Sequence, residues 1–387
     1  YDYKNLFGTD IVSSTLQVDP LRGLGLLIES KMSDLMGNHK VNLGFFGIAD
    51  FKSSTIYGEY LYLKKRVDIG VRFDRLTYFP TNGSISQRYV TNTLQTNISY
   101  PLSVYSRITA SPFITQTRFS DLSDNNAIVI YPDAKRVYVG AKFEFVYDNT
   151  TSSGMNMVEG TRAKISFDHY VNTSSSNGNF NRFNIDIRRY QKIHRGIILA
   201  LRASFGRSSG KSPKSYIFGG MDNWLFNSTG TGGVENPLAI ATGRDNTDIM
   251  LTKYVTNVRG FKYNAQSGES YFLVNAEFRL PIIKYFYSGS ISSAFLRNFQ
   301  FVAFTDVGAA WYGASPFTGN NSLNKKIITV NPFEVEVNNY RNPFLYGYGL
   351  GARTFMFGYY VKADIAWGIQ DGIRLNPQFY FTFGYDF

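Results

Sequence analysis

Hydrophobic and polar residues alternate along many short segments of the chain. The clearest example is segment 378–387, where aromatic residues take every second position from Phe379 to Phe387 and mostly polar residues take the others. Successive side chains of a β-strand point to opposite faces, so this pattern predicts strands with one lipid-facing side and one wet side. The same alternation occurs in segments 67–74, 137–145, 183–188, 197–205 and 359–367.

The alternating segments number about sixteen, and an even number lets an antiparallel sheet close into a barrel with both termini at one end. We therefore predict an all-β fold, a transmembrane antiparallel β-barrel that forms one domain over residues 1–387. Its strands are expected to begin near Val12, Leu21, His39, Thr55, Arg66, Val90, Tyr105, Arg136, Gly160, Asn181, Gly196, Glu269, Asn298, Tyr346, Tyr359 and Gln378.

Aromatic content favours a membrane barrel over a soluble β-sandwich. Aromatic residues form 17% of the chain, with 28 Tyr and 33 Phe. Transmembrane barrels place such rings at both membrane interfaces. The sequence has no long apolar run, which excludes a transmembrane helix, whereas a barrel needs only every second residue to face lipid.

Charge and metal-binding residues exclude several function classes. The net charge is +11, but Arg and Lys are spread over the strands without a basic run, so nucleic acid is not an expected partner. A charged lumen and loops near anionic lipid account for the cations, and outer-membrane lipid and lipopolysaccharide are expected partners of the protein. There is no Cys, and His39, His169 and His194 are far apart, so no metal site and no cofactor are predicted.

An enzyme is not predicted either. The run Gly206-Arg207-Ser208-Ser209-Gly210 matches the Gly-x-Ser-x-Gly pattern of hydrolases, but it ends a predicted barrel strand. A nucleophile elbow needs a strand, a turn and a helix, followed by Asp and His, and no His follows His194.

Long polar loops interrupt the strand pattern at two places. One covers residues 320–341, and the longest irregular stretch covers residues 211–257. Loops of this length within a compact fold commonly carry function. Tight turns are expected at Asp19-Pro20, Gly37-Asn38 and Lys64-Lys65. No signal peptide is visible, so we expect a mature or truncated sequence whose upstream region is missing.

A candidate site follows the longest loop. The tetrapeptide formed by Val258, Arg259, Gly260 and Phe261 precedes a predicted strand that carries Glu277 on its polar face. The polar face of the next strand carries Phe304 and Asp306, and Gly308 follows them. Because carboxylates can hold a guanidinium through two hydrogen bonds each, we expect the loop to fold into the lumen, where Arg259 binds Glu277 and Asp306.

These motifs resemble the BamA-type superfamily of outer-membrane assembly and translocation barrels (bacterial surface antigen barrels). Its loop motif is matched by residues 258–261, its Phe-x-Asp-x-Gly strand motif by residues 304–308, and its facing glutamate by Glu277. Gly219 and Gly220 match a Gly-Gly pair before the loop motif, and Tyr147 and Asp148 match a mid-barrel element. The terminal Phe also fits the pattern of the family.

Two departures qualify the resemblance. Residues 221–257 form an insertion where the family has only a few residues, and we expect it outside the cell or over the lumen. The 387 residues include no periplasmic POTRA repeat, so we expect any N-terminal periplasmic domain to lie outside this sequence. The insertion makes the chain more similar to Bacteroidetes-type members with other periplasmic regions.

The resemblance implies a function at a seam between the first strand, near residues 12–18, and the last, residues 378–387. The first strand is expected to be short and polar, so that weak pairing lets the seam open to a client strand. The resemblance also implies a Gram-negative outer membrane with both termini periplasmic, unfolded or nascent outer-membrane or secreted polypeptides as clients, and periplasmic or lipoprotein subunits as partners. The expected seam residues are Ser13, Thr15, Gln17, Phe383, Gly384 and Phe387, with Gly384 as a bend.

Three alternatives remain open at this stage. A passive porin would need an open lumen, a secretion pore would serve one dedicated polypeptide, and an accessory or structural barrel would serve a larger outer-membrane complex.

Overall fold

A computed structural model describes residues 7–49, 51–123, 133–232, 236–241, 243–317, 325–330, 332–338 and 342–387. None of the helices in these ranges is long and apolar enough to cross a membrane.

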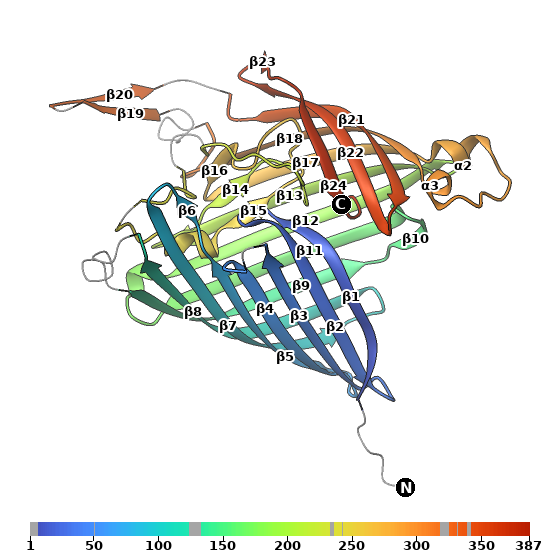
Figure 1. The fold of residues 1–387 in the computed structure, drawn as a ribbon, viewed down its shortest axis with the longest axis horizontal. Helices are drawn as coiled ribbons and strands as arrows, with labels where there is room; N and C mark the ends of the chain where they lie inside the picture. Colours follow the sequence, from blue (N-terminus) through green and yellow to red (C-terminus); the bar gives the residue numbers. More distant parts are fainter. Residues whose placement is uncertain are drawn as a thin grey trace, which may run out of the picture.

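One antiparallel sheet of 19 strands forms the wall of the molecule and curls into a barrel (Figure 1). The long strands pair in chain order, so the topology is up-and-down and the predicted fold class is confirmed. Within this sheet, sixteen strands have six or more residues: β1 (Phe7–Asp19), β2 (Gly23–Asp34), β3 (His39–Ile48), β4 (Ser54–Tyr62), β5 (Asp68–Tyr78), β7 (Ile85–Pro101), β8 (Ser106–Asp121), β9 (Ala134–Asp148), β11 (Met157–Asn172), β12 (Phe180–His194), β13 (Ile197–Gly210), β17 (Ser270–Leu280), β18 (Gln300–Trp311), β21 (Leu345–Met356), β22 (Tyr359–Gln370) and β24 (Gln378–Phe383). The other three extend hairpins: β6 (Thr81–Asn82), β10 (Thr151–Gly154) and β23 (Ile373–Arg374).

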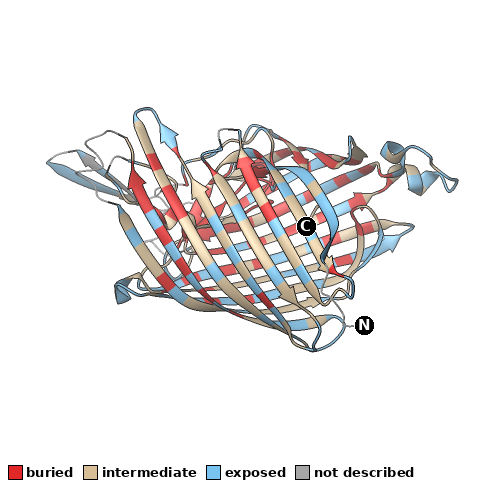
Figure 2. Ribbon diagram, turned by 60° about the horizontal axis from the view of Figure 1, so that its bottom comes forward, coloured by how far each residue is buried: buried red, intermediate tan, exposed pale blue. Residues whose placement is uncertain are grey.

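Buried and exposed residues alternate along the strands, as Figure 2 shows. One row illustrates the outer face: Phe73, Leu94, Ile114 and Val139 are directly paired across β5, β7, β8 and β9, and each side chain is more than two-fifths exposed. Such a band of exposed apolar residues is stable only against lipid. The opposite face points into the lumen.

The connection from β13 to β17 lies against the inner wall. It contains β14 (Tyr216–Phe218), β15 (Lys253–Val255) and β16 (Gln266–Gly268), which form a small sheet, and the 3-10 helix η2 (Thr247–Leu251). Ile249 packs in a buried cluster with Tyr89 and Phe119 of the wall. The insertion therefore lies over the lumen, one of the two positions expected from the sequence.

The predicted loop 320–341 is partly wrong. Residues Lys325–Val330 form β19 and Phe333–Asn338 form β20, and the two pair as an antiparallel hairpin. The segments contain β-branched residues on both sides of a turn, which favours strands. Asn320 and Arg341 lie outside the described residues. Between β17 and β18 are two short helices, α2 (Ile282–Phe286) and α3 (Ala294–Arg297).

Both terminal strands differ from the sequence prediction. The first is not short: β1 has 13 residues, because a register shift between Thr9 and Ile11 lets its pairing with β2 continue to Phe7. The last is shorter than expected: β24 ends at Phe383, and Gly384 has φ +96°, which directs the chain away from the strand.

Phe387 is consequently not a lipid-facing residue of the seam. It is buried in a cluster with Tyr190, Ile198 and Ala200 on the inner faces of β12 and β13. The C-terminal tail thus crosses into the lumen.

Candidate functional site

The two ends of the insertion lie side by side at the candidate site. Gly220 and Val258 form an antiparallel bridge, with Val258 N donating to Gly220 O at 2.9 Å. Gly219 has φ +127°, and a Cβ there would lie 2.3 Å from Lys262 O, so only glycine fits. Gly220 and Val258 are therefore adjacent in space although the insertion separates them in sequence.

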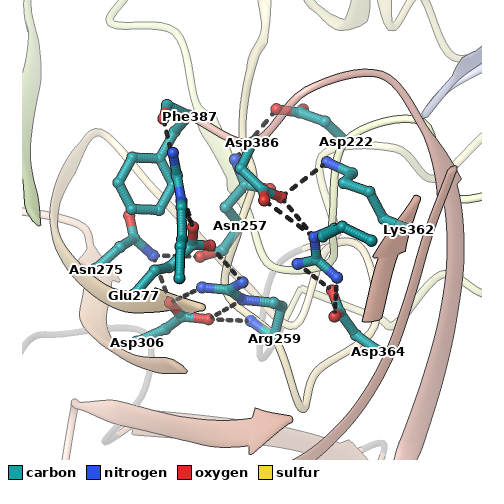
Figure 3. Close-up of polar contacts among 12 residues, drawn as sticks. Asp222, Asn257, Arg259, Asn275, Glu277, Asp306, Lys362, Asp364, Asp386 and Phe387 are labelled. Atoms are coloured by element: carbon teal, nitrogen blue, oxygen red, sulfur yellow. Dashed lines mark hydrogen bonds and ion pairs between the residues drawn. The ribbon is translucent and has the colours of Figure 1, made fainter. Parts of the chain in front are cut away.

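Arg259 is clamped by two carboxylates in the lumen (Figure 3). Its Nε donates to Asp306 Oδ2 at 2.7 Å, and its Nη2 donates to Asp306 Oδ1 at 2.8 Å. Its Nη1 donates to Glu277 Oε1 at 2.6 Å. The structure thus brings together the three charged residues that the sequence pointed to, all of them at most 1% exposed.

Close packing holds the guanidinium and its loop against the wall. The guanidinium carbon of Arg259 lies 3.6 Å from the centre of the Phe304 ring, a cation–π contact. Gly260 has φ +93°, and a Cβ on Gly347 of β21 would lie 1.9 Å from Arg259 O. Gly308 of β18 similarly faces the Phe272 carbonyl, 2.4 Å from an added Cβ. Small residues at these positions let the loop approach the strands.

The clamp extends to the C-terminal tail through Arg279. Its Nε and Nη2 donate to Glu277 Oε2 at 3.0 and 2.8 Å. Its Nη2 also donates to the Phe387 carbonyl at 3.1 Å, and Nη1 donates to Asn156 O at 3.3 Å. Glu277 therefore has two cationic partners, whereas Asp306 has one.

A second buried ion network lies beside the first (Figure 3). Arg353 binds Asp364, and its Nε donates to Asp386 Oδ2 at 2.9 Å. Lys362 Nζ lies 3.4 Å from Asp386 Oδ1, and Asn156 Nδ2 donates to Asp386 Oδ2 at 2.8 Å. Asn156 connects the two networks, because its carbonyl accepts from Arg279.

The charges in both networks are balanced, which satisfies the requirement that buried charges be paired. Burial lowers the pKa of Arg259, but Asp306 and Glu277 outweigh it and raise that pKa well above its ordinary value. For Asp386 in the tail, burial raises the pKa, but Arg353 and Lys362 outweigh it and lower that pKa well below its ordinary value. Both groups stay charged at neutral pH.

One side chain of the insertion joins the two terminal strands. Val18 N of β1 donates to Asn223 Oδ1 at 3.3 Å, and Asn223 Nδ2 donates to Phe383 O of β24 at 3.2 Å. Leu225 N donates to Phe381 O at 2.9 Å, and Trp224 forms an antiparallel bridge with Thr382. Residues Asn223–Leu225, here called the seam segment, thus occupy the outer edge of β24 as a short strand would.

The seam segment and the loop motif share a partner on β24. The hydroxyl of Tyr380 accepts from Gly260 N at 2.8 Å and donates to Phe261 O at 2.7 Å. The Trp224 ring packs against the same Tyr380 ring in a tilted arrangement, with centroids 4.6 Å apart, and its Nε1 donates to Phe379 O at 3.1 Å. Any displacement of β24 therefore acts on the loop motif.

The other residues predicted from the sequence lie away from the Arg259 clamp. Ser13, Thr15 and Gln17 pair with Glu29, Leu27 and Gly25 of β2, and Phe383 and Gly384 lie at the end of β24 beside Asn223. Tyr147 and Asp148 end β9, where Asp148 Oδ2 accepts from Arg162 Nε at 3.0 Å. The latter pair has no described contact with the Arg259 clamp.

Sequence reasoning missed Asn223, Trp224, Tyr380, Arg353 and Asp386. Asn223 and Trp224 sit in an irregular stretch with no periodic pattern. Lys362 and Asp364 take alternate positions on β22, and Asp386 follows β24 in the tail; charged residues at these positions could have indicated a second buried network.

Comparisons with known proteins support one family. Residues 61–387 match the model of the Omp85 superfamily domain. No match was found among curated proteins. The fold is similar to that of BamA from Haemophilus ducreyi lacking POTRA domains 1-3, with a TM-score of 0.61 and 11% identity over 98% of this chain.

Two further structures share the fold. CdiB from Acinetobacter baumannii has a TM-score of 0.53 and 13% identity over 97% of this chain, and CdiB from Escherichia coli has 0.51 and 10% over 98%. The chain spans 70% of that BamA chain, 57% of the first CdiB chain and 62% of the second.

Proposed function

Because the chain belongs to the Omp85 superfamily, we propose that it inserts or translocates polypeptides through a seam between β1 and β24. The family and its structural relatives mark it as a Gram-negative outer-membrane β-barrel. The observation that carries the proposal is the contact of Asn223 with the backbones of both terminal strands, at 3.3 and 3.2 Å. A joint made by one amide side chain opens at a far lower cost than a strand ladder.

In the proposed cycle, a client strand replaces the seam segment on the edge of β24. The segment satisfies the carbonyls of Phe379, Phe381 and Phe383 with two side-chain donors and one backbone donor. A client strand offers backbone donors to the same edge, so the exchange conserves hydrogen bonds within the membrane. Unpaired groups need not be exposed to lipid at any step.

The clamp of Arg259 acts as a brace in this proposal. Tyr380 joins β24 to Gly260 and Phe261, while Arg259 joins the loop to β17 and β18. The loop therefore connects β24, which moves in the proposed cycle, to β17 and β18, which stay in place. No residue is assigned a catalytic role.

The proposed setting follows from the family. Both termini would face the periplasm, clients would be unfolded or nascent outer-membrane or secreted polypeptides, and periplasmic or lipoprotein subunits would deliver them. Whether one polypeptide or many are served is decided by the proteins lost on depletion.

A disulfide across the seam segment tests the proposal. The chain has no Cys, and Trp224 and Thr382 face each other in an antiparallel bridge, so Trp224→Cys with Thr382→Cys gives one engineered pair. We expect the oxidised variant to lose client insertion or secretion and the same variant to regain it on reduction. The reduced form of the variant is the control for the loss of the Trp224 side chain. Equal activity in both redox states would refute opening at this edge.

A passive porin is the second candidate function. Against it, the insertion packs on the inner wall at two clusters, Ile249 with Tyr89 and Phe119, and Leu251 with Tyr138 and Phe180. Single-channel conductance separates the candidates: the proposal predicts low conductance that rises when residues 221–257 are deleted. An accessory barrel would leave client levels unchanged in the disulfide experiment.

A further inference from the structure

A basic hollow lies on the wall formed by β5, β7, β8 and β9. Its volume is about 520 Å³, and its lining contains five cationic residues. None of the described residues that line it is acidic. The cations are Lys52, Arg75, Arg88, Arg118 and Lys135.

Strand register places this hollow on the outer face. Tyr78, Tyr89 and Phe119 point inward, since they lie with Ile249 of the insertion in one buried cluster. Arg75, Arg88 and Arg118 lie an odd number of positions from these residues on the same strands, so they point outward. Lys135 is the direct partner of Arg118 and shares its face.

The hollow adjoins the lipid-facing band. On β5, Arg75 is two residues from Phe73, and on β8, Arg118 is four residues from Ile114, along the same face. Phe73 and Ile114 are 44% and 46% exposed. A ligand in the hollow can therefore place a charged group on the cations and an apolar part on the band.

The hollow also lies at a defined end of the barrel. In an up-and-down sheet, the connections after the third, fifth and seventh strands lie opposite the end where β1 begins. These connections follow β3, β5 and β8, and the long connections after β13 and β18 lie at the same end. In outer-membrane barrels the long loops face outward from the cell.

The described contacts of these cations include one acidic residue and one aromatic ring. Arg118 binds Asp133, and Lys52 lies 5.2 Å from the centre of the Phe79 ring. The Nε of Arg88 is buried and has no hydrogen-bond partner among the described residues. A buried donor without a partner is costly, so this atom points to a missing acceptor.

The geometry points to a binding site for the phosphate groups of a phosphorylated glycolipid in the outer leaflet, of the lipopolysaccharide type. Charged residues on a lipid-facing wall are destabilising unless they lie at the interface or find counter-charges. Several cations on adjacent strands fit a headgroup with more than one phosphate, and the apolar band below fits several acyl chains. This site rests on the outer-membrane location and not on the seam.

Binding to defined lipids tests the assignment. Arg88→Gln with Lys135→Gln removes two cations from the hollow. Lys65→Gln with Arg66→Gln removes two cations at the opposite end of the strands and is the matched control. Each protein is first compared in lipid-free detergent by thermal unfolding, so that only folded protein enters the assay. Binding to lipopolysaccharide, to phosphatidylglycerol and to inorganic phosphate is then titrated.

The wild type and the control variant are expected to bind lipopolysaccharide alike. The hollow variant is expected to bind it roughly thirtyfold more weakly, from about fivefold for each of the two cations removed. Equal affinity of hollow variant and wild type would overturn the site. Equally tight binding of phosphatidylglycerol would reduce it to a general anionic surface, and saturation by inorganic phosphate alone would make it a free-phosphate site; both outcomes overturn the proposal. Retained client handling by the hollow variant distinguishes this test from a failure of the seam proposal.

Discussion

The Arg259 clamp gives the most quantitative prediction. Replacing Arg259 by Met removes the guanidinium but keeps much of the side-chain volume. Glu277 keeps Arg279 at 2.8 Å, so the loss falls mainly on Asp306, which is 0% exposed and, among the described residues, keeps hydrogen bonds only from Asn275 and from the backbone N of residue 259. Removing one partner of a buried pair costs about 3–5 kcal/mol. We expect Arg259→Met to lower the free energy of unfolding by about that amount.

A double variant isolates the electrostatic part. Asp306→Asn removes the stranded charge, so Arg259→Met with Asp306→Asn should be more stable than Arg259→Met alone, by at least about 2 kcal/mol. The control is Arg72→Met, because Arg72 pairs with Asp74 at a site about 30% exposed and should cost less than about 1 kcal/mol.

The assay is urea unfolding in detergent micelles, followed by tryptophan fluorescence. The reasoning would be refuted if Arg259→Met cost less than the Arg72→Met control, or if the double variant were no more stable than the single one.

Three further predictions follow from particular contacts. Gly347→Ala places a Cβ 1.9 Å from Arg259 O and should cost about 1–3 kcal/mol or more in unfolding experiments, whereas Gly58→Ala, whose nearest neighbour is 3.5 Å away, should cost much less. Trp224→Ala removes the ring that packs on Tyr380, so hydrogen exchange of β24 amides should rise while exchange of β12 amides stays unchanged. Folding lowers the pKa of Asp386, so the ionised carboxylate contributes fully to stability above its ordinary pKa of about 4, and this contribution is lost as pH falls toward the folded pKa. Asp386→Asn should therefore have a lower free energy of unfolding than wild type at pH 7. The difference should shrink below pH 4.

Much of the wall could be predicted from the sequence, because period-two alternation directly reports which side chains face lipid. The prediction of about sixteen strands was right, and most boundaries differ by a few residues. The contact of Arg259 with Glu277 and Asp306 was also foreseeable, since a lone loop arginine near two inward carboxylates has few other ways to be neutralised.

The remaining features depend on tertiary contacts that local pattern does not encode. Phe387 continues the alternation of β24 in sequence, but the turn at Gly384 and the ion pairs of Asp386 carry it into the lumen. The seam segment has no periodicity of its own, because it gains its strand-like geometry only by pairing with β24. The basic hollow draws one cation from each of four strands and a fifth, Lys52, from the connection between β3 and β4, so no single segment reveals it.

The central claim is that this barrel handles other polypeptides. The direct measurement is quantitative proteomics of the outer membrane after the protein is depleted from cells, with the wild-type chain restored as the control. The account predicts that outer-membrane or secreted proteins fall and recover on restoration: many unrelated barrels for an assembly factor, or one protein or small family for a dedicated translocator. An unchanged outer-membrane proteome would contradict it.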